Sequence, residues 1–186
     1  MKIGITGSLA SGKSTASKLL SFKRGPLFSA DRTVKELYAN NSFKSLVKKK
    51  FKIDNSKIKK HLKKIILEDK KNIKKLELII HPLVRKRMKE FNLKHINKKF
   101  LFYEIPLLIE SKLMKNFDII IFIKASRQTR LKRFKLKKGD ENLFNFLNNK
   151  QLSDTKKIKF CDYVVVNEKN LNFLRKKLSS IMKKYE

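Results

Sequence analysis

The stretch KIGITGSLASGKST, residues 2–15, decides the fold. Its apolar start, residues 2–6, predicts a short strand, and residues 14–22 predict a helix. Between them, residues 7–14 read GSLASGKS and fit the pattern G-x-x-x-x-G-K-[ST]. A glycine loop between a strand and a helix turns backbone N–H groups, and the positive end of the helix dipole, toward one anion. The stretch therefore predicts a phosphate-binding loop.

The side chains of this loop have separate expected roles. Lys13 is placed to reach the β- and γ-phosphates of a nucleotide, and the Ser14 hydroxyl is placed to ligate Mg²⁺ that arrives with ATP. The alternative is a glycine turn beside a capping serine. We expect the loop and the residue after it to bind ATP through Gly7, Ser8, Leu9, Ala10, Ser11, Gly12, Lys13, Ser14 and Thr15.

Outside the loop, short apolar segments alternate with segments of helical periodicity. This alternation favours a three-layer α/β fold with about five parallel strands. Together with the phosphate-binding loop of residues 7–14, it predicts a P-loop NTPase fold. The further strands are expected at residues 27–29, 100–103, 118–123 and 163–166. The further helices of this part are expected at residues 126–136, 142–157 and 171–182.

Residues 32–99 have helical periodicity only and are predicted to form an insertion in the α/β core. The core then consists of residues 1–31 and 100–186. Within the insertion, one apolar stripe is interrupted near residues 70–72. A last helix is predicted to begin at Pro82, because proline is favoured in the first turn.

The chain carries 48 lysine and arginine residues against 16 acidic ones, a formal net charge of +32. Hydrophobic residues make up 41% of its 186 residues, which excludes a disordered basic tail. The basic residues number 15, 16 and 17 in three successive thirds, so no basic arm stands out. One interpretation is a compositional bias toward residues with A/T-rich codons, and the other is a nucleic-acid-binding surface. We favour the first, because the excess is mostly lysine, which lacks the bidentate fork that reads bases.

The cysteine content and the apolar runs bear on location. Cys161 is the only cysteine, so no intrachain disulfide can form, and a reducing, cytoplasmic location is favoured. The longest apolar runs, such as residues 119–123, are too short to span a bilayer. The N-terminal residues turn polar too early for a signal peptide. We expect no membrane partner and a monomer or weak oligomer.

Asp31 follows the second predicted strand. In an open parallel sheet the ligand lies at the carboxyl ends of the strands, at the topological switch point. A carboxylate there can orient an attacking hydroxyl or accept its proton. Alternatively, Asp31 caps a helix that begins at Arg32. Position alone leaves both interpretations open.

The sequence resembles the dephospho-CoA kinase family of P-loop kinases along almost its whole length. Ser29-Ala30-Asp31 stands where the family has Asp-Ala-Asp. Residues 81–85, HPLVR, and 105–110, IPLLIE, match its His-Pro-Leu-Val-Arg and Pro-Leu-Leu segments. The family's closing polar pattern has the same spacing here in Gln151, Asp162 and Asn167.

The resemblance implies that ATP donates its γ-phosphoryl group to the ribose 3′-hydroxyl of dephospho-CoA, giving CoA and ADP. Asp31 would activate or orient this hydroxyl, and Lys13 and Arg133 would be the other catalytic residues. The helical insertion would hold the acceptor. The acceptor-binding residues implied by the resemblance are Asp31, His81, Arg85, Pro106 and Leu107.

A mobile lid over the phosphates, at about residues 133–147, is also implied by the resemblance. Lys137 at its tip would contact ATP. Asn167 would border the adenine, with a simple turn residue as the alternative. The implied cofactor is Mg²⁺, bound together with ATP.

Three residues depart from the family pattern. Ser29 replaces an aspartate, and Lys137 and Leu147 each replace a frequent arginine. Serine adds no negative charge, and lysine loses the bidentate grip on phosphate. One alternative function is a related P-loop kinase acting on a nucleoside, nucleotide or other small hydroxyl acceptor. The other is a nucleotide-dependent protein that binds nucleic acid.

The remaining polar residues have structural interpretations beside functional ones. Glu104 lies either at the Mg²⁺ site or in a salt bridge. His81 either contacts the acceptor, as the resemblance implies, or only marks the start of a helix. His61 and His95 are expected to be solvated, and Cys161 is expected to be a small buried apolar residue.

Overall fold

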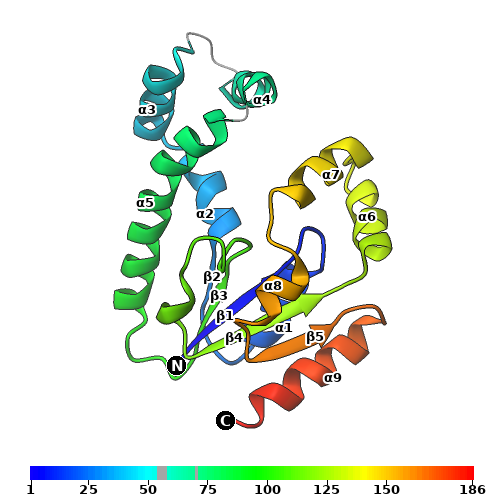
Figure 1. Ribbon diagram of the computed structural model, residues 1–186. Coiled ribbons are helices and arrows are strands. Elements are labelled where there is room, and N and C mark those ends of the chain that lie inside the picture. Colours follow the sequence, from blue (N-terminus) through cyan, green and yellow to red (C-terminus); the bar gives the residue numbers. More distant parts are fainter. Residues whose placement is uncertain (54–57, 70) are drawn as a thin grey trace. The chain divides into compact units, whose positions relative to one another are not determined.

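The computed structural model describes residues 1–53, 58–69 and 71–186 (Figure 1). It divides into two compact units, Met1–Ser29 with His95–Glu186, and Ala30–Lys94. The sequence predicts the two boundaries after residues 31 and 99. Each unit has a hydrophobic core of its own. None of the helices in the described ranges combines the length and the apolar character that crossing a bilayer requires.

The larger unit is built on one parallel sheet with the strand order β2-β3-β1-β4-β5. The α/β class with about five parallel strands is therefore confirmed. Strand β2 lies at one edge of the sheet, and β3 lies between β2 and β1. After β3 the chain passes β1, and β4 and β5 form on its other side. The loop after β1 thus emerges where the strand order reverses, the position that parallel sheets use for ligands. The strands are β1 (Lys2–Gly7), β2 (Leu27–Ser29), β3 (Leu101–Glu104), β4 (Ile119–Lys124) and β5 (Tyr163–Val166).

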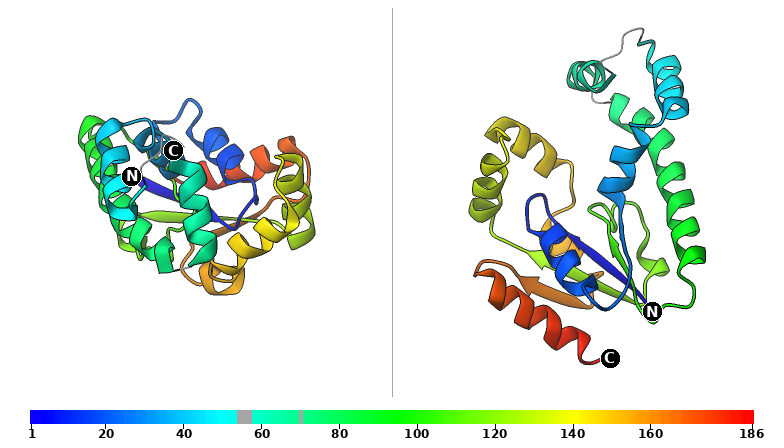
Figure 2. Two further views of the ribbon diagram at one scale, coloured as in Figure 1. Left: turned by 90° about the horizontal axis from the view of Figure 1, so that it is seen from above. Right: turned by 180° about the vertical axis from the view of Figure 1, so that it is seen from behind.

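Helices cover both faces of this sheet (Figures 1 and 2). Helices α1 (Lys13–Ser21) and α9 (Leu171–Met182) pack together on one face, and α8 (Asp154–Ile158) packs on the other against β4. The strands are apolar on both faces, as a sheet between two layers requires. The core below α1 and α9 includes the buried residues Ile3, Ile5, Ala16, Leu20, Phe102, Ile121, Leu174 and Leu178.

The segment between β4 and β5 differs from its prediction. Helix α6 (Arg127–Leu136) agrees with it, but the helix expected at residues 142–157 is two helices, α7 (Glu141–Asn149) and α8. The chain leaves helical geometry between them because the Leu152 N–H donates to the Glu110 carboxylate at 3.1 Å and Gln151 turns toward the loop after β1. A short 3₁₀ helix, η1 (Met114–Asn116), precedes β4.

The smaller unit is helical, as predicted. Its helices are α2 (Ala30–Leu37), α3 (Asn41–Phe51), α4 (Ile58–Glu68) and α5 (Lys71–Lys94). The predicted interruption near residues 70–72 falls between α4 and α5, with residue 70 outside the described residues. The buried core consists of Leu37, Phe43, Val47, Ile53, Ile58 and Leu62.

The prediction that a helix begins at Pro82 is wrong. Pro82 lies inside α5, which continues on both sides of it. Proline removes one N–H from the helix ladder, and the apolar residues before and after it pack on the same core, which keeps the helix continuous. Those partly buried residues are Leu76, Ile79, Ile80, Leu83 and Val84.

Candidate nucleotide and phosphoryl-transfer site

The loop between β1 and α1 depends on its two glycines. Gly12 precedes α1 with φ at 97°, and a Cβ there would lie 2.2 Å from Asn167 Nδ2. A Cβ at Gly7 would lie 2.4 Å from the carbonyl oxygen of Ile123. Ala10 also has a positive φ, 59°. The loop therefore follows a backbone path that side chains at positions 7 and 12 would obstruct.

Gly12→Ala is expected to weaken nucleotide binding at least tenfold and to lower the melting temperature. A left-handed conformation costs a residue with a Cβ about 1–2 kcal/mol, and the new methyl group also displaces the Asn167 amide. ATP affinity by calorimetry and thermal unfolding measure the two effects. Ser21→Ala, at the other end of α1, is the control. An unchanged ATP affinity in Gly12→Ala would show that the loop path is not what binds the nucleotide.

Lys13 and Ser14 begin α1 and point to different partners. The Lys13 side chain is buried, and its Nζ donates to the carbonyl oxygen of Ser8 at 2.9 Å. The Ser14 hydroxyl donates to Glu104 Oε1 at 2.5 Å, and the Ser29 hydroxyl donates to Glu104 Oε2 at 3.1 Å. Glu104 is buried at the end of β3. A carboxylate therefore lies beside the loop, between the serine that starts α1 and the serine that ends β2.

Arg133 and Asn167 meet at the other side of the loop. Asn167 follows β5, is buried, and donates from Nδ2 to the carbonyl oxygen of Ser11 at 2.9 Å. Arg133, in α6, donates from Nη2 to the Asn167 carbonyl at 2.9 Å and from Nη1 to the Ser11 carbonyl at 3.3 Å. Lys137, the C-cap residue of α6, is exposed and takes no part in these contacts. Two of the three residues expected here thus contact the loop in this structure.

Arg130 is a loop contact that sequence reasoning missed. Its guanidinium is buried and donates to the Leu9 carbonyl at 3.3 Å and to Asn148 Oδ1 at 2.7 Å. Burial lowers the pKa of Arg130, Asp154 opposes that effect, and Arg127 adds to it. Desolvating a guanidinium is costly unless its hydrogen bonds are made. The only signal in the sequence is the spacing of three residues before Arg133, which places both arginines on one helix face.

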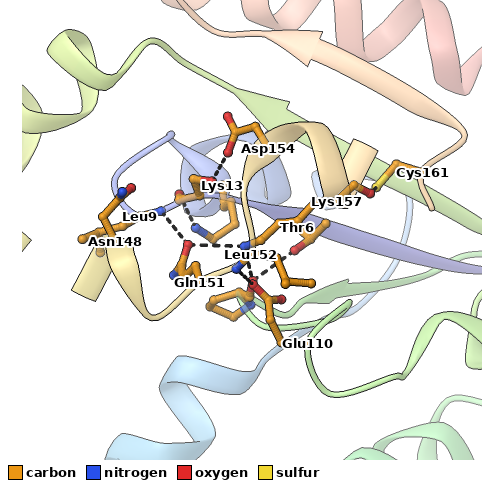
Figure 3. A network of polar contacts seen from close by, with 12 residues as sticks. Thr6, Leu9, Lys13, Glu110, Asn148, Gln151, Leu152, Asp154, Lys157 and Cys161 are labelled. Atoms are coloured by element: carbon orange, nitrogen blue, oxygen red, sulfur yellow. Dashed lines mark hydrogen bonds and ion pairs between the residues drawn. The ribbon is translucent and has the colours of Figure 1, made fainter. Parts of the chain in front are cut away.

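Gln151 and Asp154 approach the loop from the segment that was predicted to be one helix. Gln151 Oε1 accepts a hydrogen bond from the Leu9 N–H at 3.2 Å. The Ser8 hydroxyl donates to Asp154. Figure 3 shows these side chains around the loop together with Lys13 and Lys157. The break between α7 and α8 is therefore part of the site, because it allows Gln151 to reach Leu9.

Pro106 and Leu107 lie two and three residues after the end of β3 and are half-buried. The Thr6 hydroxyl, at the end of β1, donates to the Pro106 carbonyl at 3.2 Å. This bond ties the segment after β3 to the strand that carries the loop.

The smaller unit holds the other predicted site residues. Asp31 lies in the first turn of α2, which begins at Ala30, two residues before the predicted start. Asp31 therefore lies within the first turn of the helix and not at the residue before it. His81 is half-buried and Arg85 is exposed, one turn apart on one face of α5.

Two predictions about other residues need correction. His61 and His95 are half-buried, so they are not simply solvated. Cys161 is also half-buried, and its thiol donates to the Lys157 carbonyl at 3.3 Å, so it is not merely apolar filling. Burial, with a smaller effect from Asp162, raises the pKa of Cys161 to about 12. The thiol is therefore protonated at neutral pH and is a poor nucleophile.

In the part of the chain that the structure describes, no three His, Cys, Asp or Glu residues gather in a way that could hold a metal ion. Ser14 and Glu104 instead place a hydroxyl oxygen beside a carboxylate oxygen. Such hard oxygen ligands suit Mg²⁺ that is bound mainly through substrate phosphates and water.

Known proteins resemble the chain over its whole length. The family model described as dephospho-CoA kinase matches residues 1–172. A dephospho-CoA kinase from Bartonella quintana is 36% identical, over 97% of this chain and 95% of that protein. A solved dephospho-CoA kinase from Campylobacter jejuni is 26% identical with a TM-score of 0.69, covering 99% of this chain and 97% of that one. A solved protein from Thermus thermophilus, 24% identical, shares the fold with a TM-score of 0.85, covering 100% of this chain and 98% of that one.

Proposed function

The chain belongs to the dephospho-CoA kinase family, and on this premise we propose that it transfers the γ-phosphoryl group of ATP to the ribose 3′-hydroxyl of dephospho-CoA. The products are CoA and ADP. The observation that carries this proposal is the family match over residues 1–172, which includes the loop, Asp31 and Asn167. The geometry of the loop supports it, because a phosphate-binding loop with a buried lysine and an adjacent carboxylate suits phosphoryl transfer.

Residues 7–15 bind the phosphates of ATP in this proposal. The Lys13 ammonium now contacts a neutral carbonyl, that of Ser8. An anionic phosphate oxygen is a stronger acceptor for a charged donor, so the side chain gains by exchanging one for the other. Arg133 and Asn167 hold the Ser11 carbonyl and so keep the start of α1 directed at the phosphates.

Ser14 and Glu104 are the residues that would hold Mg²⁺. The pair fits the ion chemically, because a hydroxyl oxygen and a carboxylate oxygen, both hard ligands, lie side by side at the edge of the loop. When bound, the ion neutralises charge on the transferred phosphoryl group. Ser29 now hydrogen-bonds the second oxygen of Glu104, and it fixes the orientation of that carboxylate without adding charge.

The acceptor-binding residues of this proposal are the ones that the family resemblance implies. Asp31 orients the 3′-hydroxyl or accepts its proton, since it stands two residues beyond the carboxyl end of β2. His81 and Arg85 share one face of α5 and contact the acceptor, with Arg85 available for an anionic group. Pro106 and Leu107 supply apolar contact.

Arg133 and Lys137 lie in the proposed lid, residues 133–147. Closure of the lid brings positive charge to the transferred phosphoryl group and excludes water, which suppresses hydrolysis of ATP. The protein is expected to work in the cytoplasm as a monomer or weak oligomer. The net charge of +32 then favours capture of two polyanionic substrates, without a nucleic-acid partner.

A panel of acceptors tests this proposal. ADP release is measured with dephospho-CoA, with nucleosides and nucleotides, and with shikimate, each at the same ATP and Mg²⁺ concentrations. We expect dephospho-CoA to have the highest kcat/KM by at least a hundredfold. Turnover of another acceptor, with none of dephospho-CoA, would contradict the proposal and favour the related kinase.

A further inference from the structure

We propose that Lys157 is a positioning residue of the nucleotide site, which holds Gln151 so that Gln151 fixes the backbone of Leu9. This rests on the proposed function only in assuming that the loop binds ATP. Lys157 lies in α8, and its side chain has an exposed fraction of 0%. A buried ammonium group is costly unless charged and polar partners surround it. The partners of Lys157 therefore indicate what it does.

Lys157 connects two segments that flank the loop. Its Nζ lies 2.7 Å from Glu110 Oε1 and donates to Gln151 Oε1 at 3.3 Å. The same Glu110 oxygen accepts a hydrogen bond from the Leu152 N–H at 3.1 Å. The carboxylate thus holds both the ammonium and the backbone next to Gln151. Figure 3 shows Lys157 between Glu110 and Gln151, with Leu9 beyond Gln151.

Lys157 determines which way the Gln151 amide points. Gln151 Oε1 accepts two hydrogen bonds, one from Lys157 Nζ and one from the Leu9 N–H at 3.2 Å. If the amide turned over, its NH₂ group would face two donors and make neither bond. The ammonium, which has no acceptor capacity, therefore keeps the amide oxygen toward the loop.

Leu9 is held by hydrogen bonds on both its N–H and its carbonyl group. Its N–H donates to Gln151, and its carbonyl accepts from Arg130 at 3.3 Å. The next residue, Ala10, has φ at 59°, a conformation that residues with a Cβ rarely adopt. Asp154, in the same helix as Lys157, accepts from the Ser8 hydroxyl. Helix α8 and the residues before it thus hold two consecutive loop residues in place.

The consequence is a nucleotide site whose shape depends on Lys157, whose side chain contacts Glu110 and Gln151. Without the Lys157 bond, the Gln151 amide is free to turn, and the Leu9 N–H loses its partner. The loop then has more conformations to lose when phosphate binds, so ATP affinity falls. The affinity for the acceptor is expected to stay the same.

The test measures ATP binding by calorimetry in a set of variants. Glu110→Met and Lys157→Met are made together, because either alone leaves a buried charge unpaired. This double variant and Gln151→Met are each expected to raise the Kd for ATP about three- to tenfold. The triple variant, which combines all three substitutions, is expected to have a Kd for ATP no higher than the higher of these two Kd values, because Lys157 acts through Gln151. Lys156→Met is the matched control, since it removes an exposed lysine from the same helix.

Two results would overturn the proposal. One is an unchanged Kd for ATP in the folded double variant, and the other is a triple variant whose losses simply multiply. If the double variant does not fold, Glu110→Leu with Lys157→Leu takes its place, because this pair also removes both charges and the donor to Gln151, and an unchanged Kd would again be contrary. Because ATP binding is measured without acceptor, failure of dephospho-CoA turnover in the unmodified protein bears on the proposed function alone.

Discussion

Asp31→Asn is expected to lower kcat with dephospho-CoA by about 10²- to 10⁴-fold, the usual contribution of a general acid or base. The Kd for ATP is expected to change less than about twofold, since Asp31 belongs to α2 and lies outside residues 7–15, which are proposed to bind the phosphates. The reason is chemical: the amide of asparagine still forms hydrogen bonds but neither accepts a proton nor carries the charge that attracts one. Steady-state kinetics and ATP calorimetry give the two numbers.

The control for Asp31→Asn is Glu36→Gln, which neutralises an exposed carboxylate in the same helix, α2. It is expected to leave kcat unchanged. Asp31→Asn contradicts the catalytic assignment if it keeps its kcat and loses only thermal stability. In that case the charge of Asp31 stabilises the N-terminus of α2.

Lys13→Met is expected to lower kcat/KM by about 10²- to 10³-fold, the range found when one charge-stabilising donor is removed. The lysine is buried against the loop, so its charge acts in a poorly solvated place. Methionine has a similar length and apolar stem, so the packing around α1 is largely kept while the charge is lost. Kinetics with ATP and dephospho-CoA measure the effect, and thermal unfolding reports on the fold.

Lys18→Met serves as the comparison for Lys13→Met, because it removes an exposed lysine from the same helix. It is expected to change kcat/KM less than about twofold at moderate salt, where exposed charges are screened. Similar losses in the two variants would mean that general positive charge, and not Lys13 in particular, attracts the nucleotide.

The order of strands and helices in the larger unit was predictable because each strand is a short apolar run bounded by polar residues. The loop was predictable because strand, glycines, lysine and serine stand in a fixed local order. The errors arose where contacts distant in sequence decide the structure. Pro82 was expected to start a helix, yet the helix continues through it because both sides pack on one core.

The candidate site was predictable in the same uneven way. Gly12, Lys13 and Asn167 follow from motif and resemblance. Arg130 was missed because its partner, the Leu9 carbonyl, is 121 residues away in the sequence. Glu104 had two open interpretations because only the folded sheet brings the end of β3 beside Ser14. A local pattern gives no sign of which buried polar groups will meet.

The measurement that tests the central claim most directly is the fate of the γ-phosphoryl group. ATP labelled at the γ-phosphate is incubated with the protein, Mg²⁺ and dephospho-CoA, and the products are separated and identified by mass spectrometry and ³¹P NMR. We predict that the label appears in CoA as a phosphomonoester on the ribose 3′-hydroxyl, in equal amount to the ADP formed. Label found only in inorganic phosphate, or on another hydroxyl of the acceptor, would contradict the account.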